Sequence, residues 1–327
     1  DHWHCLQMVA ACEAGLDVYV EKPMANSIAE CDIMVAAAKK YNRIVQVGQQ
    51  QRSGKVWNEV MAYMKSGKLG AIRKTNIWAN FNYGLGPKRQ ANTAVPKGVD
   101  YDMFLGPAPA RSFNPARFHG DWRHFWDYGG GLMTDFGAHL IDMALWVKDI
   151  TAPPTTVLAY GNRVDDPTLA KETYDQMSVV FPMEDYLIQW ESNAGKQGGP
   201  YGRLYGLAFL GEKGTLVVDR SGYEVLPEWD NEAKVHKVEA YKSEKFSQGH
   251  DSHMKDFVNS MRNRTQPVCP PEIGRNVALY SHMANIAVRS GAYKLDWDAQ
   301  KGKFSNSKKA NALITPVYRK PWDLPKV

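Results

Sequence analysis

Asp135 and His139 stand four positions apart and directly follow three consecutive glycines, Gly129–Gly131. Apolar residues recur at helical spacing after the glycines, so the sequence predicts one helix with Asp135, His139 and Asp142 on a shared face. A carboxylate one turn before an imidazole can orient the ring and stabilise its charged form. The glycines let the backbone approach a ligand closely. The segment therefore predicts a general acid/base unit.

Two other interpretations of this helix remain open. A hydrogen-bonded pair without a chemical role is the simpler explanation for an Asp and a His on one helix face. The three side chains Asp135, His139 and Asp142 are also possible metal ligands. However, the sequence contains no second ligand cluster and no His-x-x-x-His, so we predict no metal.

Lys22 is a second candidate, because it lies in Glu21-Lys22-Pro23 directly after an apolar run at residues 17–21. The run predicts a short buried strand of a parallel sheet. Open parallel sheets bind ligands at the carboxyl ends of their strands. We therefore expect the Lys22 ammonium to point into a crevice and to bind a hydroxyl or carbonyl oxygen.

The elements that must position these residues alternate between helix and strand up to residue 70. The sequence predicts helices ending at Gly15, over 27–42 and over 55–66, and strands at 17–21 and 43–48. Such alternation indicates an α/β fold, the C-terminal part of a Rossmann-like parallel sheet. We assign residues 1–70 to this dinucleotide-binding domain.

The sequence pattern changes after residue 71, where predicted strands follow one another with only short turns between them. Strands are predicted at 74–83, 155–163, 176–181, 186–192, 206–210 and 214–218, and helices at 251–263 and 271–290. Closely joined strands indicate an open, mainly antiparallel sheet. We assign residues 71–292 to an α+β substrate and oligomerisation domain and 293–327 to an extended C-terminal tail. Too few helices follow to cover both sheet faces, so we expect a homo-oligomer through the open face.

Composition limits the possible partners of the protein. The 327 residues carry a net charge of +5 with scattered Lys and Arg, which gives no nucleic-acid footprint. No apolar run reaches the length of a membrane span. The phosphate-binding pattern Gly-x-Gly-x-x-Gly occurs nowhere in the sequence. We therefore expect that about 100 residues of the dinucleotide-binding domain are missing before Asp1, and that the chain alone binds NAD(P) weakly and tends to aggregate.

Several segments resemble the Gfo/Idh/MocA oxidoreductases, the family of glucose–fructose oxidoreductase and inositol dehydrogenase. They are Asp1–His4, Gly15–Met24 with Glu-Lys-Pro, the glycine-rich turn with Asp-x-x-x-His at Gly129–Asp142, Pro267-Val-Cys, Asn285–Ala287, Trp297-Asp298 and Tyr318–Trp322. The combination is similar to a subgroup that is common in Bacteroidetes and often exported. This resemblance implies a periplasmic protein, with a cytoplasmic one as the alternative.

The resemblance implies that Lys22, Asp135 and His139 are catalytic and that NAD or NADP is the cofactor. His139 would take the proton of a sugar hydroxyl as hydride leaves the same carbon for the nicotinamide. Lys22 would polarise the oxygen and Asp135 would support the histidine. Cofactor contacts are expected from His4, Glu21, Lys22, Pro23 and Gln51. Aromatic faces and Arg donors suit a sugar ring, so a substrate site is predicted from Arg52, Trp122, Arg123, Trp126 and Tyr128.

The sequence thus predicts an NAD(P)-dependent oxidoreductase that acts on a hydroxyl carbon of a sugar or sugar derivative. One alternative is an NAD-dependent glycoside hydrolase that works by transient oxidation and elimination. Such an enzyme would release an aglycone without net NADH. Another alternative is a non-catalytic sugar-binding module, which would not use NAD.

Overall fold

The N-terminal part of the chain forms two parallel strands covered by helices. The structure is a computed structural model that describes residues 1–244 and 249–327. The elements are α1 (His4–Glu13), β1 (Val18–Val20), α2 (Ile28–Lys40) and β2 (Val45–Val47). β1 and β2 pair in parallel, with Val18 opposite Val45. Ser27 caps α2 by accepting a hydrogen bond from the Glu30 N–H.

The second part is a ten-stranded sheet in the order β12-β9-β8-β7-β3-β6-β5-β4-β13-β14. Its strands are β3 (Ile72–Ala79), β4 (Thr156–Asn162), β5 (Gln176–Pro182), β6 (Leu187–Asn193), β7 (Tyr205–Gly211), β8 (Gly214–Val218), β9 (Tyr223–Pro227), β12 (Tyr241–Lys242), β13 (Lys294–Asp298) and β14 (Lys303–Phe304). All pairs are antiparallel except β3 with β6. The predicted fold class, a Rossmann-like unit followed by a mainly antiparallel sheet, is confirmed.

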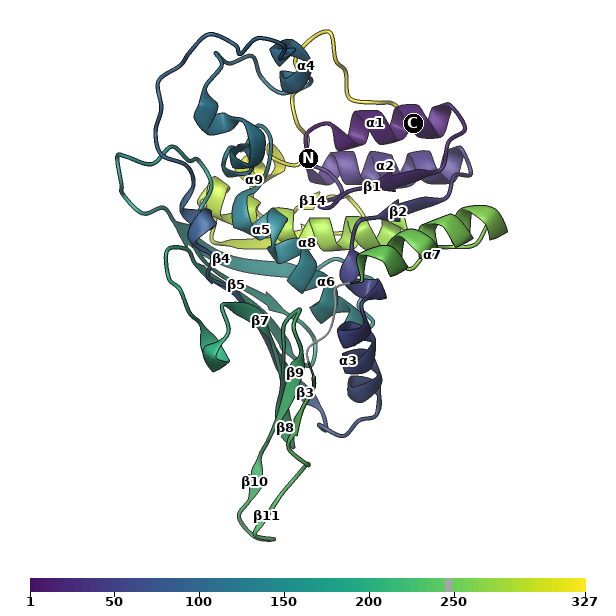
Figure 1. The fold of residues 1–327 in the computed structure, drawn as a ribbon, viewed down its shortest axis with the longest axis vertical. Helices are drawn as coiled ribbons and strands as arrows, with labels where there is room; N and C mark the ends of the chain where they lie inside the picture. Colours follow the sequence, from purple (N-terminus) through teal and green to yellow (C-terminus); the bar gives the residue numbers. More distant parts are fainter. Residues whose placement is uncertain (245–248) are drawn as a thin grey trace.

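The remaining elements connect or cover these two units (Figure 1). The α-helices are α3 (Lys55–Lys65), α4 (Tyr101–Leu105), α5 (Gly131–Asp135), α6 (Gly137–Val147), α7 (His250–Asn263), α8 (Pro271–Ser290) and α9 (Lys308–Asn311). Short 3-10 helices lie at 50–53, 82–85, 115–117, 119–124 and 200–202. The hairpin β10 (Trp229–Asp230) and β11 (Val235–His236) projects from the lower end of the sheet in Figure 1. In the described part of the chain, no helix is long and apolar enough to cross a membrane.

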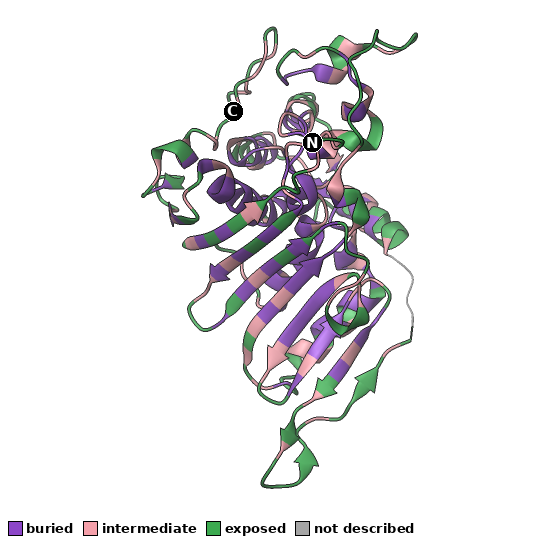
Figure 2. Ribbon diagram, turned by 90° about the vertical axis from the view of Figure 1, so that its left-hand side faces the viewer, coloured by how far each residue is buried: buried purple, intermediate pink, exposed green. Residues whose placement is uncertain are grey.

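One face of the large sheet is covered and the other is largely open. Helices α3, α6 and α8 contribute to the same apolar core as the inward-facing strand residues. In β4, Val157 and Ala159 are buried, whereas Leu158 and Tyr160 on the other face are 40% and 61% exposed. Figure 2 shows this alternation as stripes along the strands. Helix α3 thus packs on the sheet, although we assigned it to the first domain. The predicted domain limits, at residues 70 and 292, stay a prediction.

The tail assigned to residues 293–327 is not extended over its whole length. β13 adds to the sheet edge next to β4, and β14 pairs with β13. Leu295, Trp297 and Phe304 are buried there. Two short strands give too few alternating positions to stand out in the sequence, which is why this pairing was not predicted.

The single helix predicted after the glycines is interrupted at Phe136, which separates α5 from α6. The Phe136 ring packs against Phe81 and Tyr205, with centroid distances of 4.5 and 4.8 Å. Gly137 follows directly, and glycine has a low helix propensity. Asp135 and Asp142 bind different partners, Lys22 and Arg52, so the three side chains do not act as one group.

Candidate functional site

Lys22 and Asp135 form the centre of the candidate site. Lys22 lies two residues beyond β1, and its Nζ is 2.7 Å from Asp135 Oδ1 and 2.8 Å from the Asp135 carbonyl oxygen. The Tyr83 hydroxyl donates to Asp135 Oδ2 at 3.0 Å, and Arg123 Nε lies 3.3 Å from Oδ1. Burial by itself raises the pKa of Asp135, but Lys22, Arg123 and the Tyr83 bond outweigh it. Its pKa is therefore below the ordinary value, and the carboxylate is charged.

His139 is a buried imidazole in α6, with only 3% of its surface exposed. Burial, followed by the positive charges of Lys22 and Arg220, holds the pKa of His139 well below its usual value. The ring is therefore neutral near pH 7 and can accept a proton. Its Nδ1 has no hydrogen-bond partner among the described residues. Asp135 is bonded to Lys22 and not to His139, so the expected orientation of the ring by Asp135 is not seen.

Arg220 is a site residue that the sequence analysis missed. It follows β8 in a turn, and its guanidinium lies over the Phe136 ring, 4.8 Å from the centroid. Its charge acts on both Tyr83 and His139. A lone Arg in a turn after a strand gives no sequence signal. Tyr83 was visible only as the last residue of a predicted strand.

The predicted cofactor residues gather at the carboxyl ends of β1 and β2. His4 Nδ1 lies 2.9 Å from the Pro23 carbonyl oxygen, next to Lys22. Glu21 is exposed and accepts a hydrogen bond from the Lys22 N–H at 3.1 Å. Gln51 follows β2 and is buried, and neither atom of its amide group has a partner in the described structure. The structure thus brings these residues to the edge where parallel sheets bind ligands.

Arg52 does not take the substrate-binding position that we predicted. Its Nε lies 2.9 and 3.0 Å from the two Asp142 oxygens, and its Nη2 lies 2.6 Å from Oδ1. The guanidinium also stacks on Trp146. Arg52 is 8% exposed and Asp142 is not exposed at all. This buried pair joins the 3-10 helix at 50–53 to α6, so Arg52 is not free to bind a sugar.

The four other predicted substrate residues have separate places. Arg123 stacks on Trp122 at 4.5 Å and reaches Asp135, so this pair belongs to the site. Tyr128 is completely buried against His2 and Phe104, which contradicts its predicted contact with substrate.

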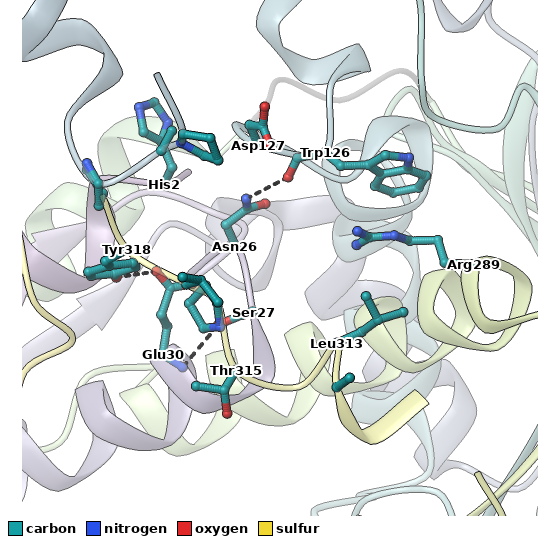
Figure 3. A pocket seen from close by; sticks show the side chains of 16 residues that line it. His2, Asn26, Ser27, Glu30, Trp126, Asp127, Arg289, Leu313, Thr315 and Tyr318 are labelled. Atoms are coloured by element: carbon teal, nitrogen blue, oxygen red, sulfur yellow. Dashed lines mark hydrogen bonds between the residues drawn. The ribbon is translucent and has the colours of Figure 1, made fainter. Parts of the chain in front are cut away.

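Trp126 lines a different cavity of about 270 Å³, shown in Figure 3. Arg289 lies 4.4 Å from its ring centroid, and the Asn26 side chain donates to its carbonyl oxygen. Buried Glu30, bonded to Tyr318, lies across this cavity. Lys22, Asp135 and His139 are not among the residues that line it.

Within residues 1–244 and 249–327, no three His, Cys, Asp or Glu side chains are grouped closely enough to hold a metal ion.

Comparison with known proteins identifies two regions of the chain. Residues 59–179 and 235–324 match the family model described as "Oxidoreductase family, C-terminal alpha/beta domain" of Gfo/Idh/MocA. Residues 2–49 match the model of the same family described as "NAD-binding Rossmann fold". These residues include Lys22, and the larger region contains Asp135 and His139.

Individual relatives agree with this assignment. The dehydrogenase AclE of Aspergillus oryzae is 30% identical over 146 residues, which are 44% of this chain and 31% of AclE. The chain thus spans about a third of the length of the curated relatives that it matches.

Two solved structures show the same fold. The aldose-aldose oxidoreductase of Caulobacter crescentus, solved with glycerol, has a TM-score of 0.65 and 18% identity, over 90% of this chain and 76% of that one. The WlbA dehydrogenase of Bordetella pertussis, solved with NADH and UDP-GlcNAcA, has a TM-score of 0.62 and 18% identity, with the same coverage of 90% and 76%. Since one family model covers more than half of the sequence and a second covers the N-terminal strands, the chain belongs to the Gfo/Idh/MocA oxidoreductase family.

Proposed function

We propose that this protein transfers hydride between a nicotinamide cofactor and a hydroxyl carbon of a sugar or sugar derivative. One observation carries the proposal: a neutral, buried imidazole, His139, lies within the electrostatic reach of a fixed ammonium, Lys22, at the carboxyl end of β1. Oxidation of an alcohol requires a base for the hydroxyl proton and a positive group for the developing oxyanion. The two side chains supply these groups.

Each side chain has a defined role in this chemistry. His139 takes the proton of the substrate hydroxyl, because its pKa is held low and the ring is neutral. Lys22 donates a hydrogen bond to the same oxygen and stabilises its negative charge. The Asp135 carboxylate is the counter-charge that holds the Lys22 ammonium in place, and the Tyr83 hydroxyl donates a hydrogen bond to that carboxylate. A bound NAD or NADP supplies the hydride acceptor. In the reverse direction, protonated His139 returns the proton.

The residues present fit the nicotinamide end of such a cofactor. The family model matched by residues 2–49 is an NAD-binding fold, so the cofactor class is a nicotinamide dinucleotide. Buried amide groups without partners are unusual in folded proteins. The Gln51 amide is such a group and has both a donor and an acceptor to offer to a ligand. Lys22, His4 and Gln51 are the residues that would hold the ring.

The sugar substrate is supported by the relatives and not by a bound ligand. The WlbA structure contains a sugar nucleotide, and the Caulobacter enzyme is named for aldoses. No specific observation favours the glycoside hydrolase or the binding module, and both are outcomes of the test below.

The substitutions His139→Ala and Lys22→Ala, each made in the full-length protein, test the proposal. Each change is expected to lower NAD(P)-dependent turnover of a sugar by roughly a hundredfold or more, because each removes an acid/base or charge-stabilising group. Nucleotide affinity should change far less in His139→Ala, which provides the internal control. Near-normal turnover by His139→Ala would refute the assignment. Aglycone release from a glycoside without net NADH would instead show the hydrolase.

We also propose self-association through the open sheet face. Leu158, Tyr160 and Leu187 are large apolar side chains exposed on that face by 40% or more. Light scattering should show an oligomer at micromolar concentration, and Tyr160→Lys should shift it toward monomer. A strict monomer at high micromolar concentration would exclude this interface.

A further inference from the structure

The candidate site has more positive than negative charge. Lys22 and Arg123 both lie against Asp135, the only carboxylate within 4 Å of either of them in the described part of the chain. Arg220 adds a third positive charge and has no carboxylate within ion-pair distance among the described residues. The two histidines His124 and His139 add no further positive charge near pH 7, since burial lowers the pKa of His124 to about 4 and holds that of His139 low. Apart from the exposed Glu21, the site thus has three cations and one anion, Asp135.

One nitrogen of the Arg220 side chain also lacks a hydrogen-bond partner among the described residues. Its Nε is buried and has no partner within the described residues. It lines a small cavity of about 10 Å³ with Gln51, whose amide atoms lack partners as well. Buried polar atoms of native proteins nearly always have partners, from the protein, from water or from a ligand. The Arg220 side chain as a whole is only partly buried, and Nε is the atom of its guanidinium that is buried without a partner.

From these observations we propose that Arg220 binds a carboxylate of the substrate, so that the enzyme acts on a sugar acid. A guanidinium offers two parallel N–H donors that match the two oxygens of a carboxylate. The space beside Arg220 has room for about one water-sized atom, which suits a carboxylate oxygen better than a phosphate group. This inference rests on the proposed function, because it names the substrate class of the same site.

The test compares direct binding of D-glucuronate, D-glucose and D-glucose 6-phosphate by calorimetry, with the protein as encoded and saturating NAD(P). Glucuronate should bind at least tenfold more tightly than glucose, about the effect of a charged hydrogen-bonded pair. Arg220→Gln should abolish this preference, and Arg220→Lys should keep part of it. Higher salt should weaken glucuronate binding only.

Arg289→Gln is the matched control, because Arg289 also stacks on an aromatic ring and lacks a described carboxylate partner, but lines the cavity of Figure 3. It should leave the preference intact. The proposal is overturned if glucuronate does not bind, if it binds no more tightly than glucose, or if Arg220→Gln keeps the preference. Tighter binding of glucose 6-phosphate than of glucuronate would likewise overturn the carboxylate assignment.

The two proposals can fail separately. If the sugar acid is the wrong substrate class, glucuronate shows no binding preference, while the wild-type protein still transfers hydride from neutral sugars in a reaction that depends on His139. If hydride transfer is the wrong function, the Arg220-dependent preference for glucuronate persists while no sugar reduces the cofactor.

Discussion

The protonation state of His139 determines the pH at which the proposed reaction runs. Burial, Lys22 and Arg220 all lower the pKa of His139, so the ring stays neutral well below pH 6.5. His139 acts as a base above its own pKa, and this activity is lost only as the pH falls through that pKa. We predict that the acid limb of kcat/KM for sugar oxidation lies clearly below pH 6.5. A half-loss of kcat/KM at pH 6.5 or above would show that another group, or a differently placed His139, is the base.

Lys22, Asp135 and His139 were predictable because each lies in a local pattern, a strand end or a glycine-rich turn before a helix. Their partners were not. Tyr83 and Arg220 come from distant loops that only the sheet brings together. Arg52 is a residue that we predicted wrongly. An Arg side chain suits a sugar site, but the burial of Arg52 beside Asp142 could not be predicted from one sequence.

At the scale of elements, the Arg52–Asp142 pair fixes α6 against the end of β2. Removing one member leaves a buried charge without a partner, which typically costs about 3–5 kcal/mol. We therefore predict a loss of that size in unfolding free energy for Asp142→Ala, measured by urea denaturation. The double variant Arg52→Met with Asp142→Leu should be much less destabilised, because it removes both charges and keeps apolar volume. A loss below about 1 kcal/mol in Asp142→Ala would show that the pair does not hold α6 in place.

Most elements followed from the sequence, because apolar periodicity, the Ser27 cap and glycines such as Gly15 act locally. The break at Phe136 and the late strands β13 and β14 did not follow. Each depends on tertiary packing, of the Phe136 ring on Phe81 and of Leu295 and Trp297 in the sheet core. The spacing of apolar residues within a short segment does not indicate such tertiary contacts.

At the scale of the whole molecule, buried histidines make stability depend on pH. Burial lowers the pKa of six of the nine histidines, to about 4 for His2, His124 and His282, to about 3 for His4, and in the same direction for His139 and His253. Unfolding returns each pKa to about 6.5, so below that pH the unfolded chain binds more protons. Their contribution to stability is complete above pH 6.5 and is lost as the pH falls toward 4. Urea midpoints should drop between pH 7 and pH 5, and an unchanged or higher midpoint at pH 5 would contradict this burial.

The periplasmic location stays a prediction.

The central claim is that His139 and Lys22 carry out oxidation of a sugar carbon by a nicotinamide. The most direct test uses a sugar deuterated at its ring carbons, incubated with NAD⁺ or NADP⁺ and the protein as encoded, and mass spectrometry of the reduced cofactor. We predict that the reduced cofactor gains one deuterium, and that His139→Ala and Lys22→Ala lower the rate of labelling by roughly a hundredfold. Reduced cofactor without deuterium, or equal labelling by the wild-type protein and His139→Ala, would contradict the account.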